Sequence, residues 1–177
     1  MPMRKNFKEM LALVKAFVFD VDGVFTDGTI IIHPSGELLR TSNTRDGYAV
    51  GVAVGRGFPV AIISGGKSDA VGVRFRGLGV QDIYLGVADK MIALEEFRKK
   101  YDLELANLLY MGDDLPDLEV MKLVGVPTCP HDAAYEVKQV AVYISSFNGG
   151  RGCVRDVIEQ VLRLNGKWGE SSDMYMQ

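Results

Sequence analysis

Short apolar segments alternate along this chain with longer amphipathic ones. The apolar segments are nearly continuous and rich in β-branched residues, as is typical of strands that are covered on both faces of a sheet. Between them, the clearest helical pattern places Met91, Leu94, Phe97 and Tyr101 on one stripe. We predict strands at residues 16–21, 59–64, 82–87, 107–112 and 140–145, and helices at residues 46–56, 67–77, 89–101, 116–124, 131–139 and 153–164.

Strands that alternate with helices of this length indicate an α/β fold with a central parallel sheet. One segment breaks the alternation: residues 29–43 form two extended runs around the turn His33-Pro34-Ser35-Gly36, which predicts a β-hairpin. No long insertion follows it, so we expect one domain over residues 1–177. The hairpin, at about residues 28–43, is then a short flap on that domain, and residues 166–177 are expected to be flexible.

Composition narrows the classes of function. The 177 residues are 47% hydrophobic and 24% charged, with a net charge of −3, which is ordinary for a globular protein and indicates no basic face for nucleic acid. No stretch approaches about 20 uninterrupted apolar residues, so we expect no membrane span and a cytoplasmic location. The two cysteines, Cys129 and Cys153, lack metal-ligand spacing and are expected to be reduced.

Acidic residues gather at two predicted strand ends. Asp20 and Asp22 close the first strand, and Asp113, Asp114 and Asp117 follow the fourth. Ligands of open α/β sheets bind outside the carboxyl ends of the strands, so both groups are expected at the same edge. Such crowding of carboxylates is unfavourable unless a cation or a proton lies between them. An oxygen-only cluster suits Mg²⁺ that is shared with a substrate phosphate.

Two further features point to phosphate chemistry. Ser64-Gly65-Gly66 ends the second long strand just before a helix and offers a hydroxyl and backbone N–H groups to an anion. Lys90 opens another helix, where a cation is unfavourable for the helix dipole, which suggests a role in the site. Together with the acids, these residues could perform phosphoryl transfer through an aspartyl-phosphate.

The same segments resemble the four motifs of the haloacid dehalogenase superfamily, in the order of that family. They are FDVDGVFTDG at 19–28, IISGGKS at 62–68, Lys90, and MGDDLPD at 111–117. The resemblance extends to the capless 3-deoxy-D-manno-octulosonate 8-phosphate (KDO 8-phosphate) phosphatases through the hairpin, NTRDGYAV at 43–50 and GGRGCVRDVIEQVL at 149–162. It implies a Rossmann-like three-layer fold with no cap domain.

The resemblance implies a role for each matching residue. Asp20 matches the nucleophile, whose other carboxylate oxygen binds Mg²⁺. Asp22 matches the general acid/base and binds the metal through its backbone carbonyl. Asp113 matches the remaining protein ligand of the metal, and Ser64 and Lys90 match the pair that holds the phosphate.

Residues around this centre are implied in the same way. Asp114 and Asp117 match supporting acids. The family is usually a homotetramer, in which the flaps pack together and a neighbour's glycine-rich segment, here residues 149–152, closes the site. The positions that match the family's substrate contacts, together with the neighbouring glycines and the arginine of that closing segment, are Asn43, Thr44, Arg45, Asp46, Gly47, Gly65, Gly66, Arg74 and Arg151.

The chain departs from the family at Gly66. Many KDO 8-phosphate phosphatases carry Arg there, and a related sialic-acid-type 9-phosphate phosphatase carries Glu. An arginine at that place could bind the carboxylate of a sugar acid through two hydrogen bonds. We expect Lys67, Arg45, or Arg151 of a neighbouring subunit to replace it.

The sequence therefore predicts a Mg²⁺-dependent phosphatase of a small phosphorylated sugar acid, with KDO 8-phosphate as the expected substrate. One alternative is the same fold acting on a sialic-acid-type 9-phosphate or another phosphomonoester. A second is a receiver-like module that accepts phosphate on Asp without rapid release, and a third is a non-catalytic subunit. Asp22, two residues after Asp20, favours turnover because a slowly hydrolysing receiver needs no such acid/base.

Overall fold

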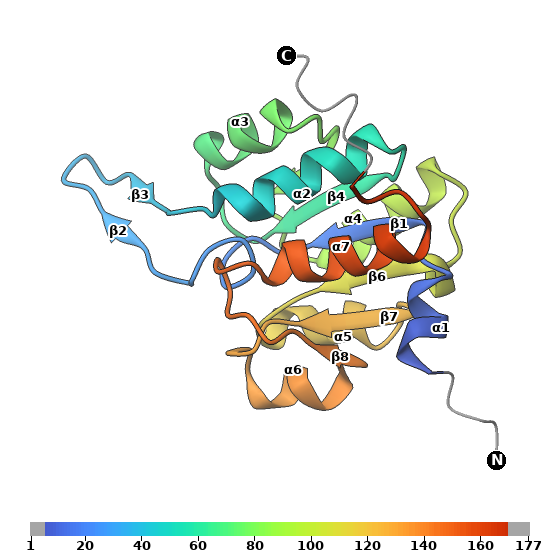
Figure 1. Ribbon diagram of the computed structural model, residues 1–177. Coiled ribbons are helices and arrows are strands. Elements are labelled where there is room, and N and C mark those ends of the chain that lie inside the picture. The colour runs from blue at the N-terminus through green and yellow to red at the C-terminus, as the bar shows by residue number, and fades with distance from the viewer. Residues whose placement is uncertain (1–5, 170–177) are drawn as a thin grey trace.

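A six-stranded parallel sheet forms the centre of the protein in a computed structural model that describes residues 6–169 (Figure 1). Its strand order is β5-β4-β1-β6-β7-β8, so the chain runs outward from β1 first in one direction and then in the other. The strands are β1 (Ala16–Phe19), β4 (Val60–Ser64), β5 (Asp82–Leu85), β6 (Leu108–Met111), β7 (Val126–Cys129) and β8 (Tyr143–Ile144).

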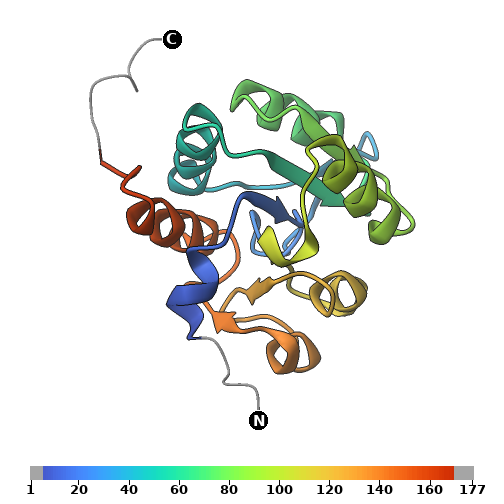
Figure 2. The same ribbon diagram turned by 90° about the vertical axis from the view of Figure 1, so that its right-hand side faces the viewer.

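Helices cover both faces of this sheet, which gives three layers (Figure 2). One buried cluster packs the sheet against α1 (Phe7–Leu11), α2 (Thr44–Gly55) and α7 (Cys153–Leu164), with Phe75 of α3 (Asp69–Gly77) joining it. The other cluster lies under α4 (Lys90–Lys100), α5 (Leu118–Met121) and α6 (Tyr135–Val140). Two short 3-10 helices, η1 (Leu105–Asn107) and η2 (Leu115–Asp117), flank β6. The predicted α/β fold with a parallel sheet is confirmed.

The main difference from the prediction is β7, which the sequence pattern misses. Pro127 lies inside this four-residue strand, and a proline argues against an interior strand because it cannot donate to the ladder. The segment predicted as a strand at 140–145 contributes only two residues to the sheet edge. The short helix α1, with Asn6 and Glu9 forming a capping box, was also not predicted. No helix among residues 6–169 is long and apolar enough to cross a bilayer.

The predicted hairpin consists of β2 (Ile31–Ile32) and β3 (Leu38–Leu39), which pair antiparallel and project away from the body of the protein (Figure 1). Its apolar side chains are unusually exposed, reaching 77% for Ile32. The predicted tail at 166–177 is described only as far as residue 169, and the rest lies outside the described residues.

Candidate active site

An open cleft of about 830 Å³ lies at the carboxyl ends of β1, β4 and β6. This is where the strand order reverses direction, the usual position of ligand sites in open α/β sheets. The predicted motif residues meet here from four separate segments of the chain. The lining includes Asp20, Asp22, Ser64, Gly65, Gly66, Lys90, Asp113, Asp114 and Asp117.

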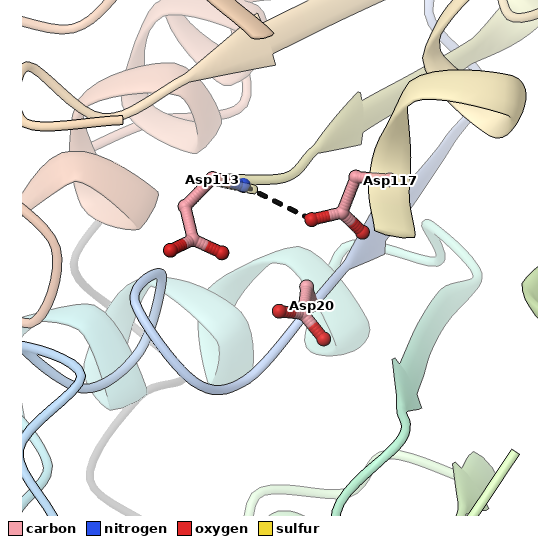
Figure 3. Close-up of side chains that lie close together, drawn as sticks. All are labelled: Asp20, Asp113 and Asp117. Atoms are coloured by element: carbon pink, nitrogen blue, oxygen red, sulfur yellow. Dashed lines mark hydrogen bonds between the residues drawn. The ribbon is translucent and has the colours of Figure 1, made fainter. Parts of the chain in front are cut away.

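Three carboxylates converge in the floor of the cleft (Figure 3). One oxygen each from Asp20, Asp113 and Asp117 lies within 4.8 Å of the others. Asp117 is fully engaged by protein groups: Oδ1 accepts hydrogen bonds from Lys90 Nζ and the Tyr110 hydroxyl, and Oδ2 accepts from the backbone N–H groups of Asp113 and Asp114. Asp117 therefore organises the cluster, while Asp20 and Asp113 present oxygens to a ligand.

Lys90 links two of these carboxylates. Its ammonium nitrogen lies 2.8 Å from Asp20 Oδ1 and 2.7 Å from Asp117 Oδ1, and only 9% of its side chain is exposed. Burial alone would lower the pKa of Lys90, but the two carboxylates outweigh it and raise that pKa. The lysine therefore stays charged in the site, which explains why it can occupy the first turn of α4 with Asp89 as the N-cap.

The remaining negative charge is poorly compensated by protein groups. Burial, followed by the nearby Asp117, raises the pKa of Asp20 to about 6, although Lys90 opposes this. Burial and the carboxylates of Asp20 and Asp117 raise the pKa of Asp113 to about 7. A cation bound next to both carboxylates would stabilise their ionised forms and so lower both pKa values.

The donor set fits Mg²⁺. Hard oxygen ligands from one or two carboxylates are its preferred protein partners, and Asp20 and Asp113 supply them. The loop after β1 makes room for this approach at Gly23, whose backbone φ is +82°. A Cβ atom there would fall 1.9 Å from Asp113 Oδ2, so only glycine allows the Asp113 carboxylate to lie against the loop.

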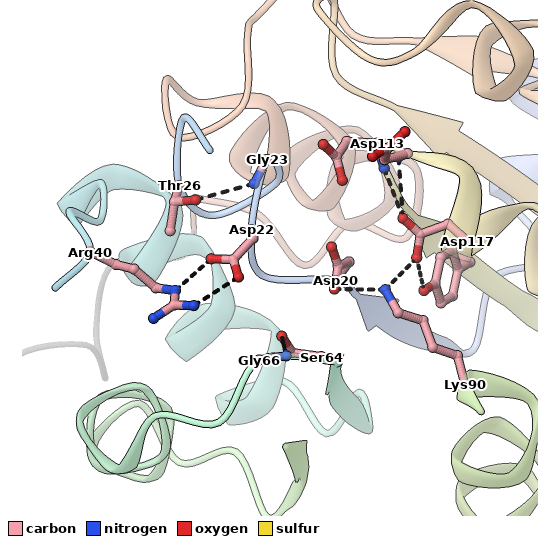
Figure 4. Close-up of polar contacts among 12 residues, drawn as sticks. Asp20, Asp22, Gly23, Thr26, Arg40, Ser64, Gly66, Lys90, Asp113 and Asp117 are labelled. Atoms are coloured by element: carbon pink, nitrogen blue, oxygen red, sulfur yellow. Dashed lines mark hydrogen bonds and ion pairs between the residues drawn. The ribbon is translucent and has the colours of Figure 1, made fainter. Parts of the chain in front are cut away.

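Asp22 lies outside the three-carboxylate cluster because its side chain turns toward the hairpin (Figure 4). Arg40 binds it with two hydrogen bonds, from Nε at 2.6 Å and from Nη2 at 3.1 Å. The Arg40 side chain is only 9% exposed, whereas that of Asp22 is 35% exposed. Because Asp22 keeps contact with the open cleft, it is placed to exchange protons with a ligand there.

The predicted anion nest begins at Ser64, the last residue of β4. Ser64 is 3% exposed, and its hydroxyl accepts a hydrogen bond from the Gly66 backbone N–H at 3.1 Å. Gly65 is exposed and Gly66 partly so, and both line the cleft. Helix α3 begins only at Asp69, with Ser68 as its N-cap. The nest is therefore a turn of three residues rather than the end of the helix itself.

The structure does not bring the other sequence-predicted substrate residues into the cleft of this chain. Asp46 is fully buried, and its two carboxylate oxygens accept hydrogen bonds from Gly152 N and Arg155 N at the start of α7. It joins α2 to α7 and has no oxygen free for a substrate. The others, which also line no part of this cleft, are Asn43, Thr44, Arg45, Gly47, Arg74 and Arg151.

These residues have identifiable local roles. Asn43 is the N-cap of α2, and its amide donates to the carbonyl of Gly150. Arg151 is exposed and pairs with Asp27 at 3.3 Å. Arg74 lies over Gly47, where an added Cβ would fall 2.5 Å from Arg74 Nη2. Their predicted contacts with substrate remain predictions.

Sequence reasoning missed two residues of the site. Tyr110 lies inside the apolar strand β6, fully buried, with its hydroxyl on Asp117. A tyrosine in a strand that is covered on both faces needs a partner for its hydroxyl, which was an available signal. The sequence offers no such signal for Arg40, because this residue is 18 positions from Asp22 and reaches it only through the fold of the hairpin.

Comparisons with known proteins agree with this geometry. The profile of the haloacid dehalogenase-like hydrolases matches residues 68–158. The 3-deoxy-D-manno-octulosonate 8-phosphate phosphatase KdsC of Escherichia coli strain K12 is 37% identical over 158 residues, which are 89% of this chain and 84% of that protein. The chain therefore belongs to the haloacid dehalogenase-like hydrolase family.

Solved structures point to the same relatives within that family. The 3-deoxy-D-manno-octulosonate 8-phosphate phosphatase from Yersinia pestis has a TM-score of 0.89 and 33% identity, and the match covers 92% of this chain and 88% of that one. The enzyme of that name from Moraxella catarrhalis, in complex with magnesium, phosphate and KDO, has a TM-score of 0.86 and 34% identity over 89% and 91%.

Proposed function

We propose that this protein is a Mg²⁺-dependent phosphatase that hydrolyses KDO 8-phosphate to KDO and inorganic phosphate. The observation that carries the proposal is the placement of Asp20 between Lys90 and Asp113 at the carboxyl edge of the sheet, beside Ser64. The substrate is argued from the relatives that bear this activity in their names, and from the structure of one of them with magnesium, phosphate and KDO.

In the first half-reaction, a carboxylate oxygen of Asp20 attacks phosphorus. The bond between phosphorus and the sugar oxygen breaks, and Asp22 gives its proton to that oxygen, so the sugar leaves as a neutral alcohol group. Lys90 fixes the orientation of Asp20 through the 2.8 Å contact with Oδ1. The Ser64 hydroxyl and nearby backbone N–H groups hold the phosphoryl oxygens.

In the second half-reaction, water attacks the phosphorus of the aspartyl-phosphate. Asp22, now a carboxylate, takes a proton from that water, and the bond from phosphorus to the Asp20 oxygen breaks. Inorganic phosphate leaves, and both aspartates return to their starting states. The exposure of Asp22 to the cleft supports this role, because the same carboxyl group must reach first the leaving oxygen and then the water.

Mg²⁺ would be held by the carboxylates of Asp20 and Asp113 and by the backbone carbonyl of Asp22. When bound, it supplies positive charge that offsets the negative charge of the carboxylates and of the phosphoryl oxygens. The cleft needs this added positive charge because, among the described residues, seven carboxylates and one lysine line it. A dianionic phosphate could not enter such a site without added positive charge.

We also propose that the protein acts as a homotetramer, through its hairpins. Ile30, Ile31, Ile32, Leu38 and Leu39 are each between 38% and 77% exposed. A protruding strand pair with this much exposed apolar surface is stabilised by burial against other copies. A neighbour's segment 149–152 would then close the cleft. Light scattering on the unaltered protein and on Ile32→Asp tests this proposal. We expect the unaltered protein to be a tetramer and the variant to dissociate. A monomeric unaltered protein would contradict the proposal.

A cytoplasmic location is proposed on two grounds. Cys129 and Cys153 are both buried and unpaired, as in proteins of reducing compartments. The proposed substrate and product are small polar molecules, and the described residues offer no helix that could span a membrane.

Steady-state phosphate release tests the function and its rivals. With Mg²⁺, we expect kcat/KM for KDO 8-phosphate to exceed that for a sialic-acid-type 9-phosphate, and EDTA to abolish both. A preference for the nine-carbon substrate would favour the alternative phosphatase. One-time labelling of the protein without continued release would favour a receiver-like module.

A further inference from the structure

Arg40 is a partly buried cation that the reaction described above does not use. It follows β3, so the returning strand of the hairpin carries it to the end of the cleft where Asp22 lies (Figure 4). Arg40 also lines a smaller cavity of about 140 Å³ beside the hairpin. Arg40 thus contacts the residue that would protonate the leaving group, from the side of the hairpin.

The guanidinium has donors to spare. An arginine offers five N–H donors in a planar fork. Nε and Nη2 each give one to Asp22, and Nη1 gives one to the carbonyl of Leu38 at 3.1 Å. Among the described residues, one N–H on Nη1 and one on Nη2 have no further partner. Two such neighbouring donors match the two oxygens of a carboxylate.

Gly66 lies where the phosphate nest, Asp22 and Arg40 come together. A Cβ atom at this position would lie 3.1 Å from Arg40 Nη2, 3.2 Å from Asp22 Oδ2 and 3.5 Å from Ser64 Oγ. A Cβ atom would be tight against these groups, so the glycine lets the Ser64 hydroxyl, the Asp22 carboxylate and the Arg40 guanidinium lie around one point. A substrate with its phosphate at Ser64 therefore has the Arg40 guanidinium close to its other groups.

Within this chain, the cations that the sequence suggests for this task, and Lys90, have other positions or partners. The stem of Lys67 packs against Gly86, where a Cβ would fall 2.7 Å from its carbons. Arg45 is exposed on the first turn of α2, and Arg151 pairs with Asp27. Lys90 is already bound to two carboxylates. Arg40 is the arginine that contacts the acid/base of the cleft.

We infer that Arg40 determines specificity by binding the carboxylate of the sugar acid through its two remaining donors while it holds Asp22. This inference rests on the proposed function. The guanidinium then joins the leaving group to the residue that protonates it, so a substrate that lacks the carboxylate is bound less well and aligned less well. Gly66 and the arginine from the hairpin then form one recognition element.

The test compares two substrates that have the same phosphate ester: KDO 8-phosphate and its carboxamide, in which a neutral amide replaces the carboxylate. The ratio of their kcat/KM values is measured for the unaltered protein, Arg40→Met and Arg40→Lys. If a substitution only misplaces Asp22, kcat/KM falls by the same factor for both substrates and the ratio does not change. We expect Arg40→Met to lower the preference for the acid by about 10- to 150-fold, the range for a charged hydrogen-bonded pair, mainly through KM. Arg40→Lys should recover part of it.

Arg163→Met is the matched control, because Arg163 also pairs with a carboxylate, that of Glu159, but on the surface of α7. It should leave the ratio unchanged. A ratio that Arg40→Met leaves unchanged, with kcat reduced for both substrates, would overturn the inference and make Arg40 only a positioning residue for Asp22. If Arg40→Met does not fold, an unchanged ratio in Arg40→Lys overturns it equally. Failure of the unaltered protein to hydrolyse KDO 8-phosphate would instead overturn the proposed function.

Discussion

Lys90 Nζ lies 2.8 Å from Asp20 Oδ1, and this contact joins the first turn of a helix to the end of the central strand of the sheet. The two side chains are each 9% exposed. A buried pair of this kind fixes geometry more than it adds stability, because both charges lose their hydration. The pair therefore gives the carboxylate that we propose as the nucleophile a single orientation.

Replacement of Lys90 by Met should therefore damage catalysis far more than folding. Without the ammonium group, Asp20 and Asp117 repel each other and take up protons, which removes the ionised nucleophile. We expect kcat to fall at least about 100-fold, with a loss of about 1–3 kcal/mol in the free energy of unfolding. Kinetics and urea denaturation measure the two effects, and a kcat within a few fold of the unaltered value would contradict this role for Lys90.

Replacement of Asp117 should instead affect stability more than catalysis, because its carboxylate is a buried acceptor that joins several parts of the site. Asp117→Ala removes the acceptor for Lys90, for the Tyr110 hydroxyl and for two backbone N–H groups. Leaving buried donors unsatisfied costs about 2–4 kcal/mol in total, after some relief of repulsion among the acids. Thermal and urea unfolding measure this loss.

Asp114→Ala is the control for that substitution, since it removes an exposed carboxylate of the same segment, which only caps η2 through the backbone N–H groups of Leu115 and Asp117. It should cost about 1 kcal/mol or less. Equal destabilisation by the two substitutions would show that the hydrogen bonds of Asp117 do not organise the segment.

The raised pKa values of Asp20, about 6, and Asp113, about 7, predict how metal-free protein responds to pH. Both groups bind protons more tightly when folded than at their ordinary value of 3.8, so stability is greatest below about pH 4 for these two groups and declines as pH rises toward 7. Mg²⁺ competes with those protons and should raise Tm more at pH 8 than at pH 5.

Melting curves with EDTA and with Mg²⁺ at the two pH values measure this difference. Asp20→Asn should reduce the decline, because one of the two buried charges is gone. A Mg²⁺ effect of the same size at pH 5 and pH 8 would contradict the view that the metal replaces protons on these carboxylates.

The sequence predicted the elements whose signals are local. Helix α7 has its predicted residues, 153–164, because the helical pattern of apolar positions lies entirely within the segment. The sequence locates the acids and Ser64 because each lies at or soon after the end of a strand, and parallel strands bring their carboxyl ends to one edge. The sequence pattern misses β7 because it contains Pro127, and a proline argues against a strand unless the position of that strand in the sheet is known.

Contacts that depend on how distant segments fold together were not predictable in this way. Asp46 matched a substrate-binding pattern, yet the backbone amides that it caps are more than 100 positions away. Arg40 reaches Asp22 only because the hairpin returns beside the cleft. Residues of this kind have no periodicity or spacing that marks them, so only the three-dimensional arrangement identifies them.

The central claim is that Asp20 attacks phosphorus, and acid quenching of a single turnover tests it most directly. The unaltered protein, mixed with KDO 8-phosphate and Mg²⁺, should carry a phosphoryl group on the peptide that contains Asp20, and the group should disappear as phosphate is released. Asp20→Asn should remain folded, acquire no phosphoryl group and release no phosphate. Turnover by Asp20→Asn at a rate near that of the unaltered protein, or a phosphoryl group on a different residue, would contradict the mechanism.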